Sequence, residues 1–362
     1  MLLRWLRQVY RTAEPMGVTL ATVPQGRALA VLLSHDVDFG VSLQNSLVYA
    51  SAEAAQQVHA TYFIQTKYVR DWNDKAFLDA AGLDSLRALR ALGGEVASHS
   101  VAHSPVFASL PTGSGSEQYP GYVPFVKSRG ETQGATLLGE LRVSRYLLQQ
   151  ALPDARIDAF RPGHLQYPFG LPEAMRATGY RYSSSLTSGT ALSHLPYRLS
   201  HHGDGRAAVS VWEFPITLED ERVRPMDTVL LPRALEVARQ LGAYGGMCVV
   251  LIHPEVLADK LRFQQAFVAR MREGGAWIGS LGEFAPWWEA RDGVEVDVEA
   301  DGGPARLVLR SPVAINGLAL QLPAGWRLAA DSRLLATPGV HGQSVNLPAG
   351  TTILPLEAAD RR

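Results

Sequence analysis

Short apolar runs alternate with helical patterns of apolar residues over the first two-thirds of the chain. The runs that predict strands cover residues 28–34, 60–65, 95–98, 157–161, 180–184, 208–216 and 247–253, with another around Trp277. Apolar residues at helical spacing cover residues 41–60, 78–92, 132–152, 171–178, 232–241 and 260–272. Alternation of this kind is typical of parallel βα units, and roughly seven or eight units predict an α/β fold, a distorted (β/α)7–8 barrel.

The pattern changes after Trp287 and Trp288. Residues 293–356 are punctuated by Gly and Pro, alternate at 294–298 and 306–310, and contain no long helical pattern. This segment predicts a small antiparallel all-β domain. We therefore divide the chain into an N-terminal helical lead-in (1–27), a barrel (28–290) and a small β domain (291–362).

Composition narrows the possible functions. Of the 362 residues, 46% are hydrophobic, which allows a large core, and the net charge of -1 favours neither nucleic acid nor an acidic membrane as a partner. Cys248 is the single cysteine, so an intramolecular disulfide and a multi-Cys zinc site are excluded.

The sequence also bears on targeting. No apolar run reaches the ~18 residues of a transmembrane helix, and the start of the chain is too polar for a signal peptide. Arg4, Arg7 and Arg11 suit the exposed side of a short amphipathic helix. Either the protein is not exported, so that it is cytoplasmic, or the chain is a piece of something longer.

Carboxylates and imidazoles follow two of the predicted strands. Asp36 and Asp38 come after the first strand, where residues i and i+2 point the same way, and His99 and His103 lie four residues apart after strand 95–98. Strand ends meet at one end of a barrel, and a carboxylate with a His pair can hold a divalent metal and leave a position for water. A helix-capping or turn role for the aspartates and a chance His pair are the alternatives.

Two further strand ends carry reactive side chains. A buried Arg161 needs a carboxylate partner, which Asp36 or Asp38 could supply, and the Pro-Gly turn after it can expose a backbone N–H to an oxyanion. His253 follows the most apolar strand, whose Leu251 would help to tune its pKa. An ordinary ion pair and a capped structural histidine are the alternatives for Arg161 and His253.

One long irregular segment follows the histidine pair. Residues 104–130 are rich in Gly, Pro and Ser and contain Tyr119, Tyr122 and Phe125. Loops of this length inside a compact domain are often functional. The segment is either a surface insertion or an aromatic wall of a substrate cleft.

Four strand-end motifs in this order resemble those of the polysaccharide deacetylases of carbohydrate esterase family 4, also called the NodB-homology family. The motifs are Ser-His-Asp-x-Asp, His-x-x-x-His, Arg-Pro-Gly-His and Leu-Ile-His-Pro, and the similarity covers roughly residues 28–290. The resemblance implies a distorted, often seven-stranded (β/α) barrel. It also implies hydrolysis of an N-acetyl group through attack by a metal-bound water.

The resemblance assigns a role to each motif residue. Asp38, His99 and His103 would hold the metal, usually zinc, with cobalt or nickel as substitutes. Asp36 would be the general base, Arg161 would hold Asp36, and His253 would be the general acid. Leu251 would line the pocket for the acetyl methyl group, and the backbone around His164 would share the oxyanion.

The chain departs from the family pattern at three points. The first motif usually has adjacent aspartates, and the third usually has Tyr where His164 stands, so His164 itself could touch the substrate. Residues 179–185 look like a further family motif, which lies between the last two of the four motifs and often begins with the Asp that orients the acid histidine; here Ser183 stands in its place. The residue that orients His253 is therefore left open, with Glu213 as the candidate.

We expect an N-deacetylase of an acetylated amino-sugar polysaccharide. Residues 61–68 and the terminal β domain look similar to the deacetylase region of the Pel exopolysaccharide biosynthesis protein. That likeness implies an N-acetylgalactosamine-rich polymer, with an N-acetylglucosamine-containing polymer as the other possibility. It also implies a role in the biofilm matrix, a periplasmic or extracytoplasmic location, and secretion-complex partners if the chain is a fragment of a larger protein. The alternatives are a catalytically lapsed glycan-binding barrel and a small-molecule amidase or deformylase with the same metal chemistry.

The two aspartates should respond differently to substitution. Asp36→Asn should keep the metal and lose activity, because Asp36 is the base, whereas Asp38→Asn should weaken both, because Asp38 is a ligand. Metal content and acetate release measured on the two purified variants check this. Equal loss of metal in both variants would contradict the division of roles.

Overall fold

The computed structural model describes the whole chain except residues 1, 201–208, 301–303, 330–333, 335–336 and 360–362. The side chains of residues 2–4 and 7 are also not described. The predictions for the Arg4 and Arg7 side chains and for residue 208 therefore lie outside the described residues. No helix in the described part of the chain is long and apolar enough to cross a membrane.

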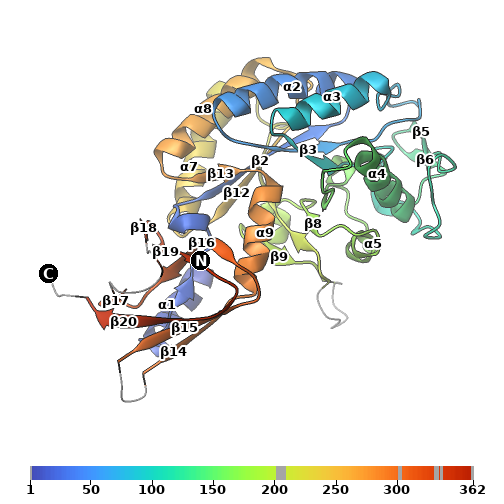
Figure 1. The fold of residues 1–362 in the computed structure, drawn as a ribbon. Coiled ribbons are helices and arrows are strands. Elements are labelled where there is room, and N and C mark those ends of the chain that lie inside the picture. The colour runs from blue at the N-terminus through green and yellow to red at the C-terminus, as the bar shows by residue number, and fades with distance from the viewer. Residues whose placement is uncertain (1, 201–208, 301–303, 330–333, 335–336, 360–362) are drawn as a thin grey trace.

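A curled, mostly parallel sheet forms the larger part of the molecule (Figure 1). Its strands follow the order β11-β12-β2-β3-β4-β7-β8-β10-β9, and β13 also pairs with β2. The strands are β2 (Ala30–Val37), β3 (Thr61–Ile64), β4 (Glu95–Ser98), β7 (Ala159–Phe160), β8 (Tyr182–Ser183), β9 (Tyr197–Arg198), β10 (Trp212–Glu213), β11 (Ile216–Glu219), β12 (Met247–Ile252) and β13 (Trp277–Gly279). β10 pairs with β8 near one end of the sheet, and β11, the next strand in the chain, pairs with β12 at the other end. The short segment between β10 and β11 therefore joins the two ends of the curled sheet. The predicted α/β barrel is confirmed.

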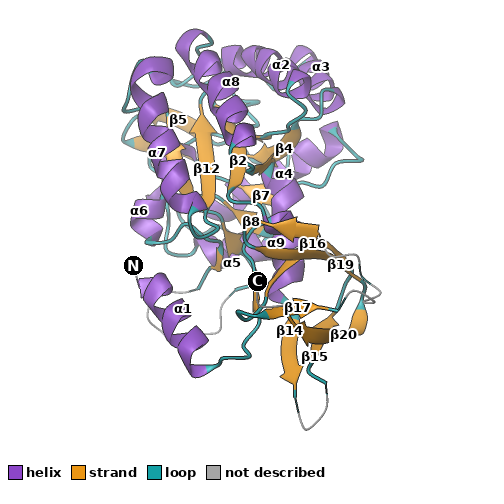
Figure 2. Cartoon of the chain, turned by 90° about the vertical axis from the view of Figure 1, so that its left-hand side faces the viewer, coloured by secondary structure: helices purple, strands orange, loops and turns teal. Residues whose placement is uncertain are grey.

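Helices cover the outside of this sheet (Figures 1 and 2). They are α2 (Gly40–Ala55), α3 (Ala80–Ala91), α4 (Leu137–Ala151), α5 (Leu171–Ala177), α7 (Leu231–Gly242) and α8 (Ala258–Glu273). Side chains alternate between the two faces of each strand. On β2, Val31 and Leu33 pack outward in the helix-covered core, whereas Ala30 and Leu32 belong to a second core inside the barrel.

The inner core is closed at one end by α9 (Leu281–Asp292). Ser280 begins this helix with a capping box to Glu283, which satisfies two backbone N–H groups of the first turn. Phe284 is fully buried, and its ring lies 6.2 Å from that of Phe214 in the barrel. The open end of the barrel is therefore the end where the parallel strands finish.

Two antiparallel sheets form the terminal β region. One has the order β14-β15-β20-β17 and the other β1-β16-β19-β18. Their strands are β1 (Thr19–Leu20), β14 (Glu295–Glu299), β15 (Arg306–Ser311), β16 (Ile315–Gln321), β17 (Trp326–Leu328), β18 (Thr337–Gly339), β19 (Gly342–Leu347) and β20 (Gly350–Ala358). β1 comes from the N-terminal segment, after helix α1 (Leu2–Ala13), and pairs with β16. The domain boundaries stay predictions, but this pairing ties residues 19–20 to the β region.

Two predicted elements differ from the structure. The helix expected over residues 132–152 begins at Leu137, because Thr136 caps it and the preceding residues form a hairpin of β5 (Phe125–Ser128) and β6 (Glu131–Gln133). The strand expected over 208–216 is divided into β10 and β11, and β11 continues to Glu219. This longer β11 carries Asp220 to the open end of the barrel.

Candidate metal centre and catalytic cleft

Strand alternation brings the polar side chains to the open end of the barrel. Leu32 on β2 and Leu251 on β12 face the inner core, so Asp36 and His253, an even number of residues further on, share their direction. Ala97 and Ala159 lie in the same core and precede His99 and Arg161 by two residues. The structure therefore gathers the predicted strand-end residues in one place.

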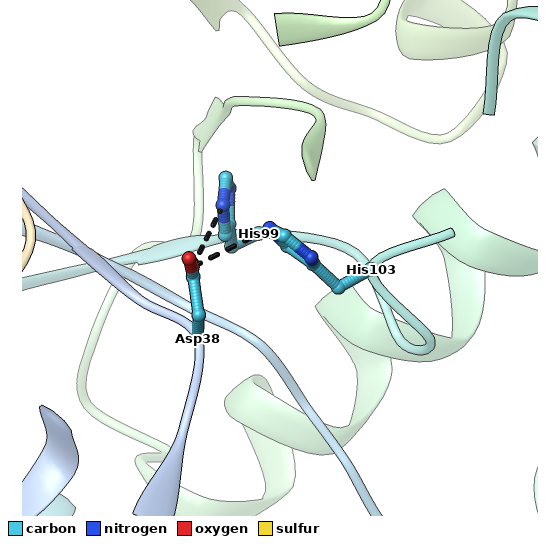
Figure 3. Close-up of side chains that lie close together, drawn as sticks. All are labelled: Asp38, His99 and His103. Carbon is cyan, nitrogen blue, oxygen red and sulfur yellow. Dashed lines mark ion pairs between the residues drawn. The ribbon is translucent and has the colours of Figure 1, made fainter. Parts of the chain in front are cut away.

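Asp38, His99 and His103 form a compact group of buried ligand atoms (Figure 3). Asp38 Oδ1 lies 3.2 Å from His99 Nε2 and 3.4 Å from His103 Nε2. Two ligands on a tetrahedral zinc ion with bonds of about 2.0–2.2 Å lie roughly 3.3–3.5 Å apart. These three residues could hold a divalent cation.

Hydrogen bonding around the group supports this fit. The carbonyl of Arg161 lies 2.8 Å from His99 Nδ1, which sets Nδ1 as the protonated nitrogen and leaves Nε2 a lone pair for a metal. Asp38 Oδ1 is buried and has no hydrogen-bond partner among the described residues. A buried, orphaned carboxylate oxygen that faces two imidazole nitrogens is a site for a cation.

The ionisation of the three residues also suits a cation. Burial disfavours the charged form of Asp38, but the charges of His103 and His99 outweigh it and hold the pKa of Asp38 below its usual value. Burial lowers the pKa of His103 to about 3, so this ring is neutral, as a ligand must be. Burial alone would lower the pKa of His99, but Asp36 and Asp38 outweigh it and raise this pKa. A cation that binds to His99 would therefore displace a proton.

A buried carboxylate from α4 holds the turn between the two histidines. Glu140 Oε2 accepts hydrogen bonds from the backbone N–H groups of Val101 and Ala102, both at 2.9 Å. The Tyr122 hydroxyl donates to the other oxygen at 2.9 Å. Within this turn His103 has a φ of 51°, a left-handed conformation that a non-glycine residue adopts at some cost. The Glu140 contacts stabilise that conformation.

Arg161 is fully buried and is the partner of Asp36. Its Nη1 lies 2.6 Å from Asp36 Oδ1, and its Nη2 donates to the hydroxyls of Ser34 and Ser184 at 3.1 and 2.8 Å. The guanidinium also lies 4.1 Å from the centre of the Phe63 ring. A buried charge needs such complete pairing. Asp36 Oδ2 remains on the side of the metal group, 3.8 Å from His99 Nε2.

Asp220, which sequence reasoning missed, orients His253. Asp220 Oδ1 lies 2.7 Å from His253 Nδ1, and Asp220 Oδ2 accepts the His253 backbone N–H at 2.8 Å. Lys260 pairs with Asp220 at 2.7 Å. The Glu213 candidate was wrong, because its carboxylate accepts the backbone N–H groups of Ser185 and Leu186. Asp220 directly follows β11, which pairs with β12, and this pairing is known only from the fold.

The cation-binding group opens into a cavity of about 720 Å³. Asp36, Asp38 and His103 line it together with His164, Leu251 and His253. The His164 ring lies 4.4 Å from the His103 ring, and burial lowers the pKa of His164. The structure thus places His164 and Leu251 in the lining of the same cavity as Asp36 and His253.

The two tyrosines predicted as a cleft wall lie elsewhere. Tyr122 is buried on Glu140, and Tyr119 packs edge-on against Tyr68 at 5.2 Å. Neither belongs to the cavity lining. The substrate contact predicted for Tyr122 is therefore corrected: Tyr122 is buried, and its hydroxyl donates to Glu140, which holds the histidine turn. The substrate contact of the exposed Tyr119 stays a prediction.

No protein-family model matches this chain, and no curated protein matches it. A solved structure from Mycobacterium smegmatis, assigned by name to the polysaccharide deacetylases, matches with a TM-score of 0.52 at 17% identity, over 76% of this chain and 96% of that one. Peptidoglycan deacetylase PdaC from Bacillus subtilis matches with a TM-score of 0.44 at 11% identity, over 75% and 96%. A carbohydrate esterase family 4 pseudoenzyme from Bacillus anthracis matches with a TM-score of 0.42 at 16% identity, over 70% and 64%. At 17% identity the first match shows a shared fold.

Gly163 should be necessary for metal affinity. A Cβ at this position would lie 2.6 Å from His103 Cδ2, so Gly163→Ala must displace the imidazole or the loop. We expect affinity for zinc to fall by about 10- to 100-fold, as when a ligand loses its support. A competition titration with a chromogenic chelator measures this. Gly189→Ala is the matched control, because its nearest neighbour would be 3.9 Å away; equal affinities in the two variants would contradict the packing argument.

Proposed function

We propose that this protein is a metal-dependent N-deacetylase of carbohydrate esterase family 4 that acts on an acetylated amino-sugar polysaccharide. The observation that carries the proposal is that a candidate general base and a candidate general acid, each with its own charged partner, flank one cation-binding group. Asp36 with Arg161 lies on one side, and His253 with Asp220 on the other. The shared fold with a named polysaccharide deacetylase supports the same reaction class.

Asp38, His99 and His103 would hold the cation, which when bound polarises the amide carbonyl and lowers the pKa of water. Asp36 accepts a proton from the attacking water, and Arg161 holds the Asp36 carboxylate in place through their ion pair. His253 donates its Nε2 proton to the leaving nitrogen as the C–N bond breaks, which yields acetate and the free amine. Leu251 gives the acetyl methyl group an apolar surface.

His253 has the ionisation that a general acid needs. Burial disfavours its charged form, but the Asp220 hydrogen bond and the charge of Asp38 outweigh burial and raise the pKa to about 10. His253 is then protonated at neutral pH. A cation bound at Asp38 would cancel part of this effect, so the contribution of Asp220 is the one that persists.

The finer proposals follow from the sequence resemblance. We propose zinc as the metal and an N-acetylgalactosamine-rich exopolysaccharide of the Pel type as the substrate. We also propose a role in biofilm-matrix synthesis, within a periplasmic assembly. The Arg161–Asp36 and Asp220–His253 pairs favour catalysis over a lapsed glycan-binding barrel, since Asp220 takes the place of the aspartate that is missing at Ser183.

Acetate release tests the proposal and separates its rivals. We expect the zinc-loaded protein to release acetate from N-acetylgalactosamine or N-acetylglucosamine oligomers at least about 10-fold faster than from the monomers, since binding energy from remote sugars promotes catalysis. Treatment with a chelator should abolish the release, and zinc should restore it. Equal turnover of monomers would indicate a small-molecule amidase. Absence of acetate from every oligomer, with metal bound, would refute the proposal.

Asp220→Asn should move the alkaline limb of the pH profile. Deprotonation of His253 removes the acid as pH rises through its pKa, so a lower pKa brings the loss to lower pH. We expect the limb of kcat/KM to move down by about 1–3 pH units. Asp227→Asn changes the same charge further along the chain, where Arg262 pairs with Asp227, and serves as the control. An unmoved alkaline limb in Asp220→Asn would show that Asp220 does not tune the acid.

A further inference from the structure

A second cavity lies at the opposite end of the barrel from the metal centre. It has a volume of about 1040 Å³ and is enclosed by the loop before β2, by β13 and α9 of the barrel, and by β16, β18 and β19 of the β region. Both views place α9 beside the β region (Figures 1 and 2). Trp277 in this cavity pairs with Ala30 at the start of β2. Asp36 lies six residues on, or roughly 20 Å at about 3.3 Å per residue.

Two tryptophans form one wall of this cavity. Trp277 and Trp287 are both half-buried, and their rings lie 5.4 and 5.7 Å from the ring of Phe284. Trp287 Nε1 donates to the Asn316 carbonyl at 3.1 Å, which fixes the ring across the junction with β16. Indole rings held in this way present a broad apolar surface whose orientation is set before any ligand arrives.

The remaining lining is polar but almost neutral. Asn316 is exposed at the rim, and the Asn346 amide is fixed because its Oδ1 accepts the Gly317 N–H at 2.9 Å. Arg27 and Glu283 are the charged residues of the lining among the described residues. Glu283 already accepts from the Ser280 backbone and pairs with His59 at 2.7 Å. A ligand here would meet flat aromatic rings and amide groups and little net charge.

Close contacts fix the backbone where the loop before β2 meets the β region. Gln25 has a φ of 59°, and the carbonyl of Gln25 lies so near Gly339 that a Cβ there would approach it to 2.7 Å. A Cβ on Gly317 would lie 3.0 Å from Gln25 Cγ. Glycines on β16 and β18 therefore let the loop before β2 seat against the β region. These contacts hold one part of the cavity wall in place before a ligand binds, which lowers the ordering cost of binding.

We infer that this cavity is a non-catalytic binding site for a neutral saccharide. The saccharide would be an acetylated stretch of the substrate polymer, an identity that rests on the proposed function. The aromatic wall would stack against the apolar faces of the sugar rings. The amides would pair with hydroxyl and acetamido groups. Because the metal centre lies at the other end of the barrel, the site would hold the polymer at a distance from the reacting sugar.

The test uses two probes, a tetramer of N-acetylgalactosamine and tetra-N-acetylchitotetraose, and the readout is the indole N–H signals of Trp277 and Trp287 in NMR spectra. These signals are assigned by Trp→Phe substitution, and they report on this cavity even when the catalytic cleft also binds the probe. We expect saturable shifts with a Kd below about 1 mM. Asn316→Arg, which fills the cavity from an exposed position, should weaken binding by at least about 10-fold.

Val313→Arg is the matched control, since Val313 is an exposed residue just before β16 and lies outside the lining. It should leave the shifts unchanged, and the unfolding temperatures of both variants show whether they fold. Indole signals that do not move, or equal binding by Asn316→Arg and the control, would overturn the inference. Acetate release is measured on the same samples. Release without indole shifts from either tetramer defeats this inference alone, and shifts without release from both tetramers, with metal bound, defeat the catalytic proposal alone.

Discussion

The buried ion pair between Arg161 and Asp36 is the interaction on which the rest of the site depends. The guanidinium is fully buried, and each of its nitrogens donates to Asp36 or to a serine beside it. The carbonyl of the same residue sets the protonation of His99. One arginine therefore orients the proposed base through its side chain and a metal ligand through its backbone. Breaking such a buried pair costs about 3–5 kcal/mol, so the fold and the site are coupled at this residue.

Two further carboxylates extend this arrangement outward. Glu140 accepts the backbone N–H groups between the two histidines, and Asp220 binds both the ring and the backbone of His253. Each of the two is itself held from behind, Glu140 by Tyr122 and Asp220 by Lys260. A ligand or an acid whose support is fixed in this way keeps its geometry without reorganisation during the reaction. The segment 104–130 thus contributes to the site through its buried Tyr122.

Much of the fold and the cation-binding group could be predicted from local sequence. The strand before Asp36 and the strand before His253 are uninterrupted apolar runs, so their ends, and the residues that emerge there, were visible as patterns. The alternation of side chains along a strand also directs His35 to the face opposite Asp36, and His35 pairs with Glu53 on the outside of β2. Strand ends of a barrel converge, which is why four distant motifs could be assigned to one site.

The supports could not be predicted, because they depend on contacts between segments far apart in the chain. Asp220 required the knowledge that β11 runs on to Glu219 beside β12, where the apolar pattern is weak. Glu140 lies on a helix and carries no local sign that it faces a turn near His103. Strand β1 is two residues long and is defined only by its pairing with β16. Tertiary packing, not local preference, decided all three.

The most direct test of the account is an anomalous diffraction measurement on crystals grown with zinc, with data collected on both sides of the zinc absorption edge. The account predicts one strong peak among Asp38 Oδ1, His99 Nε2 and His103 Nε2, at about 2.0–2.3 Å from each. It also predicts that Asp36 stays paired with Arg161 and outside the coordination sphere of the zinc. Absence of a peak at this group, or a peak with Asp36 as a ligand, would contradict the central claim.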